Sequence, residues 1–262
     1  MPEVRSVTPL VRTLLAPNPG PMTLDGTNTW ILGRPGGPSI VVDPGPSDEG
    51  HLRRVAAAAG EVAVTVLTHR HHDHSEGLRR FAELTGSGVR ATDPAYATPA
   101  GGHDGRLDDG LELAVVGLRV RVLATPGHTS DSTSLLLHTP EGAWLLTGDM
   151  VLGRGTTVIT HPDGDLAAYL DSLATMRAVV RDHDVTAILP GHGPVVTEPR
   201  AVLDYYQRHR LERLDQVRAA LRHGDRTAAA VVARVYADVD RSLWPAAEQS
   251  VRAQLDYLRA HP

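Results

Sequence analysis

The chain has 262 residues, of which 41% are hydrophobic and 22% are charged, a balance typical of a folded protein with one large domain and a small second one. The net charge of −5 excludes a general basic field for nucleic acid, and the absence of cysteine excludes disulfides, thiolate metal ligands and a cysteine nucleophile. The sequence has neither a signal-peptide pattern at its start nor a run of ~20 apolar residues elsewhere, so we expect a cytoplasmic protein without a membrane partner.

Short β-branched segments bounded by Gly, Pro and Asp alternate with longer stretches of helical periodicity along most of the chain. The segments predicted to be strands are residues 27–32, 39–43, 62–67, 118–123, 132–137, 143–147 and 186–189. Apolar residues at helical spacing predict helices over residues 75–86 and 165–182. Because the strands come in groups with helices between them, the pattern favours an α/β sandwich over an all-β barrel.

The pattern changes after residue 196, and from there it is helical to the end. A long helix with one apolar face comes first, and two shorter helices follow over residues 228–239 and 246–260. The apolar face of the long helix consists of Leu203, Tyr206, Leu214, Val217 and Leu221. We therefore predict a catalytic domain over residues 1–196 and a helical C-terminal domain over residues 197–262.

Candidate metal ligands follow four of the predicted strands. Segment 62–67 runs into THRHHDHSEG, and the later strands lead through Gly or Pro to further candidates. The candidates are His69, His71, Asp73, His74, His128, Asp149 and His192. Functional groups gather in the loops at strand ends, so these side chains can meet at one edge of a sheet. One such loop alone is usually a turn, but four in order predict a metal site, and imidazole with carboxylate favours Zn²⁺, with Mn²⁺ or Fe²⁺ as alternatives.

The pattern H-x-H-x-D-H over residues 69–74, together with the three later ligands, resembles the metallo-β-lactamase superfamily in its dinuclear hydrolase form. The resemblance covers about residues 20–196 and implies an αββα sandwich. It implies a zinc ion held by His69, His71 and His128, a second held by Asp73, His74 and His192, and a bridging Asp149. Asp43 matches the family's aspartate that orients a ligand imidazole from behind, although an Asp before Pro also starts turns. His72 falls on a variable position and is predicted not to bind metal.

The chemistry that this site predicts is hydrolysis. Two metal ions about 3.5 to 4 Å apart can share a hydroxide, lower its pKa and stabilise the attacking and leaving oxygens. The predicted nucleophile is the metal-bridging hydroxide, and Asp73 is the predicted catalytic residue, because its carboxylate can accept a hydrogen bond from that hydroxide and aim it. Relatives with a Cys ligand, or with Glu where this chain has His71, are excluded.

Three further stretches, residues 18–32, 148–159 and 205–217, resemble the beta-lactamase-like protein 2 family. That resemblance implies a small winged-helix domain at the C-terminus. It also implies an endoribonuclease acting on single-stranded RNA or, as in other relatives of the branch, a thioesterase acting on carrier-bound acyl groups. No strands that would form a wing follow the last predicted helix, so we expect a truncated, all-helical version of the domain, which reads nucleic acid less well.

Candidate substrate contacts are less specific than the metal ligands. Asn28 and Thr29 lie in a segment expected beside the metal site, and the hydroxyls of Thr156 and Thr157 can bind an oxyanion or cap the next turn. His161 and His209 are the other histidines that can lie near the site. Arg210 belongs to an arginine-rich helix that can contact RNA phosphates, and its arginines are Arg208, Arg210, Arg213, Arg218, Arg222 and Arg226. The interleaved Glu212 and Asp215 fit a solvated helix face equally well.

These observations leave three functions open. We predict a dinuclear metal-dependent hydrolase that acts as a phosphodiesterase, an endoribonuclease on single-stranded RNA. The alternative is a thioesterase on CoA-linked or carrier-linked acyl groups, with an apolar groove between the domains. A non-catalytic RNA-binding module is disfavoured because none of the ligand positions is altered. The sequence also leaves a homodimer open.

Overall fold

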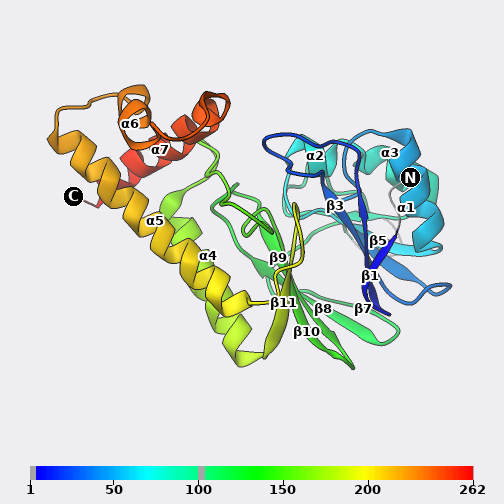
Figure 1. Ribbon diagram of the computed structural model, residues 1–262. Coiled ribbons are helices and arrows are strands. Elements are labelled where there is room, and N and C mark those ends of the chain that lie inside the picture. Colours follow the sequence, from blue (N-terminus) through cyan, green and yellow to red (C-terminus); the bar gives the residue numbers. More distant parts are fainter. Residues whose placement is uncertain (1–3, 100–103, 262) are drawn as a thin grey trace.

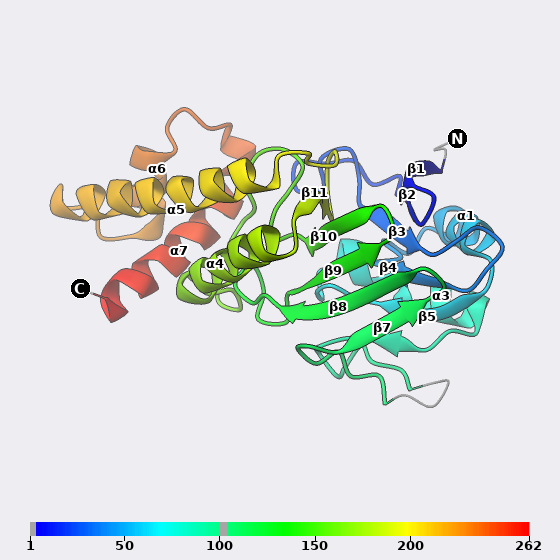
Figure 2. The ribbon, with the colours of Figure 1, turned by 90° about the horizontal axis from the view of Figure 1, so that it is seen from below.

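The computed structural model describes residues 4–99 and 104–261 of the chain. Two β-sheets stack face to face, and each has helices on its outer face (Figure 1). The covering helices are α1 (Glu49–Ala59) and α3 (Leu78–Thr85) on the first sheet and α4 (Leu166–Asp182) and α5 (Pro199–Arg222) on the second. The predicted αββα sandwich is therefore confirmed, and Figure 2 shows that further helices extend from one end of it.

The first sheet has six strands, which lie side by side in their sequence order. They are β1 (Arg5–Thr8), β2 (Val11–Leu15), β3 (Asn28–Leu32), β4 (Ser39–Val42), β5 (Val62–Val66) and β6 (Val89–Arg90). β1 to β4 are antiparallel, whereas β4, β5 and β6 run parallel, which requires crossovers through α1 and through α2 (His72–Ser75) with α3. Side chains alternate across the sheet, so Trp30 and Leu32 face the second sheet while Ile31 packs with the helices.

The second sheet has five strands in the order β11-β10-β9-β8-β7. They are β7 (Glu112–Val115), β8 (Leu118–Ala124), β9 (Thr133–Thr139), β10 (Gly142–Gly148) and β11 (Val185–Pro190). β7 to β10 form an antiparallel meander, and β11 returns parallel to β10 after α4. Val120, Leu135 and Trp144 of this sheet fill the space between the two sheets.

Aspartate and glycine set the ends of several helices. Asp48 accepts a hydrogen bond from His51 N (2.6 Å) at the start of α1, and Asp165 accepts one from Ala168 N (2.7 Å) at the start of α4. Gly86 ends α3 with a φ of 70°, a left-handed conformation that favours glycine. Within the described residues, no helix is both long and apolar enough to cross a membrane.

Over the described residues after β11, the secondary structure consists of helices, as expected. These are α5, α6 (Ala228–Val235), the short 3₁₀ helix η1 (Arg241–Leu243) and α7 (Trp244–Ala260). The first half of α5 packs into the core of the second sheet through Leu203 and Tyr206, whereas its second half forms a separate core with α6 and α7 around Val217 and Val251. Because α5 belongs to both cores, the division at residue 196 stays a prediction.

Several elements were not predicted from the sequence: α1, β1, β2, β6 and β7. The buried face of α1 combines Leu52 and Val55 with Ala59 and His51, and its small or polar members weaken the apolar periodicity. The predicted helix over residues 75–86 is divided into α2 and α3 at Gly77, where an added Cβ would lie 2.7 Å from Pro46 O. The predicted helix over residues 228–239 ends at Val235.

Candidate metal centre

The candidate ligands lie at one edge of the sandwich, where strands of both sheets end. β4 and β5 run parallel in the first sheet, and β8, β10 and β11 share one direction in the second. The loops after these strands carry Asp43 after β4, residues 69–74 after β5, His128 after β8, Asp149 after β10 and His192 after β11. Strands that point the same way place their carboxyl ends at one edge, so distant parts of the sequence deliver ligands to one place.

One group of candidate ligands comprises His69, His71, His128 and Asp149, whose ligand atoms lie within 4.8 Å of one another. His71 Nδ1 is 3.1 Å from His69 Nε2 and 3.0 Å from His128 Nε2. Asp149 Oδ2 lies 3.9 Å from His69 Nε2 and 3.8 Å from His128 Nε2. This first group therefore offers three imidazoles and one carboxylate to a single point.

A second group comprises Asp73, His74 and His192. His192 Nε2 is 3.1 Å from Asp73 Oδ2 and 3.2 Å from His74 Nε2. Asp149 also reaches this group, since its Oδ1 is 3.4 Å from His74 Nε2 and its Oδ2 is 3.3 Å from His192 Nε2. The carboxylate of Asp149 therefore faces both groups, and its Oδ1 is buried without a hydrogen-bond partner among the described residues.

The protonation of the imidazoles fits a cation at the centre of the cluster. His128 Nδ1 donates to Val158 O (2.6 Å) and His192 Nδ1 donates to Gly26 O (3.1 Å), because a carbonyl oxygen only accepts. In a neutral imidazole the opposite nitrogen then carries a lone pair, and here that nitrogen points at the other ligand atoms. His74 Nδ1 is likewise bonded to Asp43, so with both imidazoles neutral the lone pairs of His74 Nε2 and His192 Nε2 face one another at 3.2 Å. A proton or a metal ion between them removes the repulsion, and this donor set fits a metal ion.

The two groups differ in their electrostatics. Burial lowers the pKa of the His71 imidazole to about 4. Burial acts in the same direction on His192, but the carboxylates of Asp149 and Asp73 outweigh it and raise its pKa to about 9. Burial would raise the pKa of Asp149, yet the charges of His192 and His74 hold it well below its usual range. The carboxylate that faces both groups is therefore ionised at neutral pH.

Asp43 lies directly behind the second group. It is 1% exposed, and its Oδ2 accepts hydrogen bonds from His74 Nδ1 (2.8 Å) and Thr68 Oγ1 (2.7 Å). Thr68 Oγ1 in turn accepts from His69 Nδ1 (3.0 Å), because its own proton is given to Asp43. The carboxylate predicted to orient an imidazole thus contacts His74 directly and reaches His69 through Thr68.

Thr27 and Asn18 also support the cluster, although the sequence did not indicate them. Thr27 Oγ1 donates to Asp73 Oδ2 (3.1 Å), and Asn18 Nδ2 donates to Thr27 Oγ1 (2.9 Å). The neighbouring residues, predicted as substrate contacts, have other partners. Asn28 Nδ2 donates to the carbonyls of Pro190 and Gly193 in the loop that carries His192, and buried Thr29 Oγ1 lies 2.9 Å from His51 Nε2. Thr27 stands one residue earlier in the same DGTNTW stretch, but the sequence does not distinguish it from Asn28 and Thr29.

Residues 150–160, which follow Asp149, form a loop held by side chains of the outer helices. Tyr206 of α5 accepts from Leu152 N (2.9 Å), and Arg210 Nη2 donates to Thr157 O (2.5 Å). Ser250 of α7 accepts from Ile159 N (3.1 Å). The same loop provides Val158 O, which accepts from His128 Nδ1. The C-terminal helices therefore fix the backbone that orients one of the candidate ligands.

A cleft of about 470 Å³ opens beside the cluster and extends to the C-terminal helices. His71, Asp73, His128, Asp149 and His192 form part of its wall. The predicted contacts Thr156, Thr157, His209 and Arg210 line it, whereas Asn28, Thr29 and His161 do not. The imidazole of His161 instead lies 3.0 Å from Asp256 Oδ2.

Two arginines of the arginine-rich segment form ion pairs within α5. Arg208 lies 4.0 Å from Glu212, and Arg218 lies 2.9 Å from Asp215. Arg210 is 3% exposed and points into the protein, so it does not belong to the solvent-facing set that was expected to contact phosphates.

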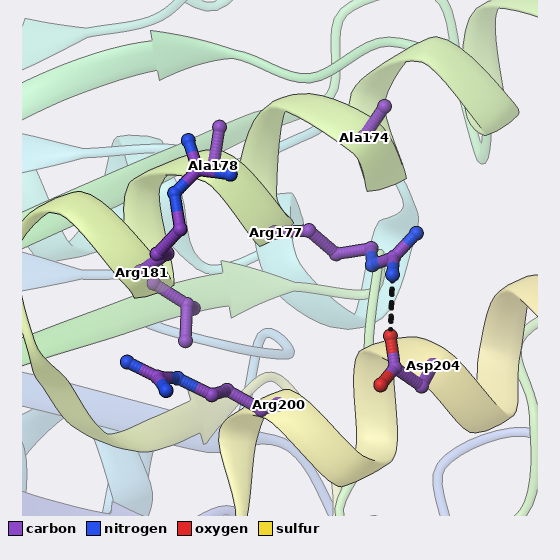
Figure 3. Close-up of a pocket in the computed structure, with 7 residues that line it drawn as sticks. Ala174, Arg177, Ala178, Arg181, Arg200 and Asp204 are labelled. Atoms are coloured by element: carbon purple, nitrogen blue, oxygen red, sulfur yellow. Dashed lines mark ion pairs between the residues drawn. The ribbon is translucent and has the colours of Figure 1, made fainter.

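A second hollow, of about 390 Å³, lies on the outer side of α4 and α5 and contains none of the candidate ligands. Figure 3 shows Arg177, Arg181 and Arg200 around it, with Arg177 turned toward Asp204, to which it is paired at 2.8 Å. Arg181 is paired with its neighbour Asp182. The cations of this hollow are exposed and largely neutralised, so the cleft beside the cluster is the candidate site.

Comparisons with known protein families agree with this geometry. The model of the metallo-beta-lactamase superfamily matches residues 22–192, and that of the beta-lactamase associated winged helix domain matches residues 227–261. A beta-lactamase-like protein 2 homolog from Caenorhabditis elegans is 34% identical over 98% of this chain and 89% of its own. An atrochrysone carboxyl ACP thioesterase from Aspergillus chevalieri is 35% identical over 85% of this chain and 69% of its own.

Solved structures show the same arrangement. A beta-lactamase domain protein from Burkholderia ambifaria has a TM-score of 0.80 and 25% identity, covering 99% of this chain and 88% of that one. A metallo-beta-lactamase family protein from Thermus thermophilus has a TM-score of 0.79 and 23% identity, covering 98% and 95%, and shows the fold alone. The superfamily match includes every candidate ligand from His69 to His192. The chain therefore belongs to the metallo-β-lactamase superfamily, as a metal-dependent hydrolase of the beta-lactamase-like protein 2 family.

Proposed function

We propose that the protein is a two-metal hydrolase of acyl thioesters. The observation that carries this proposal is the cleft, because the histidine and aspartate cluster shares its wall with a largely apolar lining. Leu24 and Leu152 contribute from the sandwich, and Tyr236, Val239 and Leu243 contribute from the helical region. Such a lining suits an acyl chain held beside a reacting carbonyl. The relative named as a thioesterase of an acyl carrier protein supports the same substrate class.

A phosphodiester substrate has less support in the cleft. The cations of the lining are Arg154, Arg210 and Arg213, and Arg154 is already paired with Asp25 at 2.5 Å. An RNA backbone needs several accessible cations and aromatic faces on which bases stack. The aromatic ring in the lining, Tyr236, is covered by Arg213, whose Cζ lies 4.5 Å from the ring centre. Cleavage of single-stranded RNA stays a prediction that the experiment below also tests.

In this proposal each of the two groups of the cluster would hold one metal ion, and the carboxylate of Asp149 faces both groups. When bound, the ions supply a water that is nucleophilic at neutral pH and positive charge for the carbonyl oxygen. Asp73 has the role of accepting a hydrogen bond from the attacking water and orienting it. Its side chain is 26% exposed, Thr27 Oγ1 donates to its Oδ2, and His74 and His192 lower its pKa against the effect of burial, so an ionised carboxylate faces the cleft.

The leaving group is consistent with a thioester. A thiolate can depart without a proton donor, because thiols have a pKa of about 8.5, whereas a sugar alkoxide is far more basic. Among the described residues that line the cleft outside the cluster, the imidazole that could serve as a proton donor is that of His209. Burial and the charges of Arg210 and Arg213 lower its pKa to about 4, so it is neutral at pH 7 and does not act as a general acid.

The test is thiol release from a series of N-acetylcysteamine thioesters by the zinc-loaded protein, with labelled single-stranded RNA incubated in parallel. We expect hydrolysis of thioesters, a loss of about 10² to 10⁴-fold in Asp73→Asn, and no RNA cleavage. His72→Asn is the matched control, since His72 is exposed beside the cluster, and should change the rate by less than about twofold.

RNA cleavage by the parent that Asp73→Asn abolishes, together with no thiol release, would replace the thioester proposal with a phosphodiesterase. Thiol release that survives in Asp73→Asn would remove the role proposed for this carboxylate. Circular dichroism of each variant shows whether a loss reflects unfolding instead.

A further inference from the structure

We propose that the cleft contains an anion-binding subsite, formed by Arg210 and Arg213 of α5, which holds a carboxylate or phosphate group of the substrate. The inference uses the proposed function for the identity of the bond that is cleaved, but the subsite itself is argued from the charges of the cleft. It assigns a specificity to the site: a substrate with an apolar portion and one acidic group.

Arg210 carries a buried positive charge without a carboxylate partner. It is 3% exposed, its Nη2 donates to Thr157 O, and its Cζ lies 4.8 Å from the ring centre of Tyr169. No carboxylate of the described residues bonds to it, and its Nε is buried without a hydrogen-bond partner. A buried guanidinium whose partners are the carbonyl of Thr157 and the side chain of Tyr169 is costly to keep, unless an anion approaches it when the site is used.

Arg213 lies one helical turn further along α5 and also lines the cleft. Its Nη1 donates to Val235 O (3.0 Å) and Gln216 Oε1 (2.8 Å), and the guanidinium covers the ring of Tyr236. These partners are neutral. They fix the position of the guanidinium and leave its charge uncompensated, which is the arrangement expected of a preformed anion site.

The other arginines of the helical region have a carboxylate partner or are exposed to water. Six of them form ion pairs: Arg200 with Asp184, Arg208 with Glu212, Arg218 with Asp215, Arg234 with Asp225, Arg252 with Glu248 and Arg259 with Asp256. Three others, for which no ion pair is found within the described residues, are exposed to water: Arg222, Arg226 and Arg241. Carboxylates or water thus compensate the arginines outside the cleft, whereas buried Arg210 and half-buried Arg213, which line it, lack a carboxylate.

The rest of the lining does not oppose an anion at this place. Within the described lining, the carboxylates are Asp73 and Asp149, and both belong to the metal cluster. Thr156, Gln249 and Ser250 add neutral polar groups to the same cleft. The lowered pKa of His209, caused by burial and then by Arg210 and Arg213, agrees with a positive potential along this part of α5. An acidic group of the substrate therefore meets attraction from α5 and little repulsion.

The experiment compares three thioesters and uses the zinc-loaded protein. Glutaryl and pentanoyl N-acetylcysteamine have acyl chains of equal length and no phosphate, and only the first has a free carboxylate. Pentanoyl-CoA carries the phosphates on the thiol side. We expect one of the two anionic substrates to exceed pentanoyl N-acetylcysteamine in kcat/KM by about 10 to 100-fold, the effect of one charge-assisted hydrogen bond of about 1.5 to 3 kcal/mol. Which one does so identifies the source of the anion.

Arg213→Gln should remove that preference, so that kcat/KM falls more for the preferred anionic substrate than for pentanoyl N-acetylcysteamine. Arg208→Gln is the matched control, because Arg208 lies on the same helix but is exposed and paired with Glu212, and it should retain the preference. Arg213→Lys keeps the positive charge and should retain part of the preference for the anionic substrate. Equal kcat/KM values for all three substrates in the parent, or equal losses on all three in Arg213→Gln, would overturn the subsite.

A binding measurement separates this inference from the proposed function. Calorimetric titration of the zinc-loaded parent should show tighter binding of glutarate than of pentanoate, and Arg213→Gln should abolish the difference. If thioesters are not hydrolysed but this difference is found, the proposed function fails and the subsite stands. If the parent binds both acids equally and binds CoA no more tightly than N-acetylcysteamine, the subsite fails whatever the enzyme cleaves.

Discussion

In the group of Asp73, His74 and His192, the outer nitrogens of the two imidazoles are bonded to Asp43 and Gly26, and Asp73 Oδ2 accepts from Thr27; all three partners lie in or beside the first sheet. In the group of His69, His71 and His128, the outer nitrogen of His128 is bonded to Val158, in the loop that the C-terminal helices hold. The outer nitrogen of His71 has one long contact, 3.5 Å from Thr160 Oγ1 in the same loop.

The two halves of the site therefore depend on different parts of the fold. The second group is supported by the sandwich itself and by the charge of Asp43, whereas the first group depends in part on α5 and α7. Partners behind a metal ligand fix its orientation and raise its basicity, and the second group has the stronger ones. We therefore expect the second group to bind zinc more tightly than the first.

The largest effect should come from the one residue that both groups share. Asp149→Asn removes the negative charge that faces His69 and His128 on one side and His74 and His192 on the other. We expect both metal ions to bind weakly and activity to fall by about 10³-fold or more, because the ions supply several kcal/mol of transition-state stabilisation. Metal analysis after dialysis checks the first point, and the same change at the exposed Asp171 is the control. Loss of a single ion would show that Asp149 serves one group only.

Asp43→Asn should separate the two groups. The carboxylate accepts from His74 Nδ1 directly but reaches His69 only through Thr68, so zinc affinity should fall by about 10 to 100-fold in the second group and by less in the first. Stepwise zinc titration against a competing chelator measures both constants. Equal losses in both groups would show that Asp43 supports the cluster as a whole.

The pH dependence of zinc binding should also differ between the groups. With a pKa of about 4, His71 is neutral at pH 7, whereas His192, with a pKa of about 9, is protonated in the metal-free protein. A zinc ion must displace that proton, so affinity in the second group should rise by about tenfold or more per pH unit between pH 7 and 9, while the contribution of His71 to the first group stays flat above pH 4. Calorimetry in buffers of different ionisation enthalpy counts the protons released.

The raised pKa of His192 should also make the stability of the metal-free protein depend on pH. Because the folded-state pKa of His192 is raised above its unfolded value of about 6.5, its contribution to the free energy of unfolding is fully present below that pH. It is lost as pH rises through about 9. An unfolding temperature that increases over this window in metal-free protein would contradict the assignment.

The sequence was informative where one element alone sets the position of a residue. The ligands follow strands directly, so their convergence at one edge could be predicted from strand ends and from the turns that carry them. Thr27 could not be distinguished from Asn28 and Thr29, because neighbouring residues of a strand differ only in the face they occupy and the facing partner is distant in sequence. The contacts of Arg210 and Ser250 with the loop after Asp149 could not be predicted from the sequence for the same reason, since they join residues 53 and 91 positions apart.

The smallest effect, and the most specific test of the comparison, should come from Ser250→Ala in α7. This change removes the hydroxyl that accepts from Ile159 N, and a hydrogen bond of this kind contributes about 0.5 to 1.5 kcal/mol. We expect zinc affinity in the first group to fall by about two to tenfold and the second group to keep its affinity, because only the first group depends on the loop of residues 157–160. The exposed Ser242 is the matched control, and the visible spectrum of the Co²⁺-loaded protein reports the geometry around His128 directly. A spectrum unchanged in Ser250→Ala would mean that the loop keeps its position without α7, and an equal loss in both groups would mean that α7 acts on the stability of the whole fold. Either result would remove the distinction between the two halves of the site, since that distinction requires the C-terminal helices to act on one group through this loop.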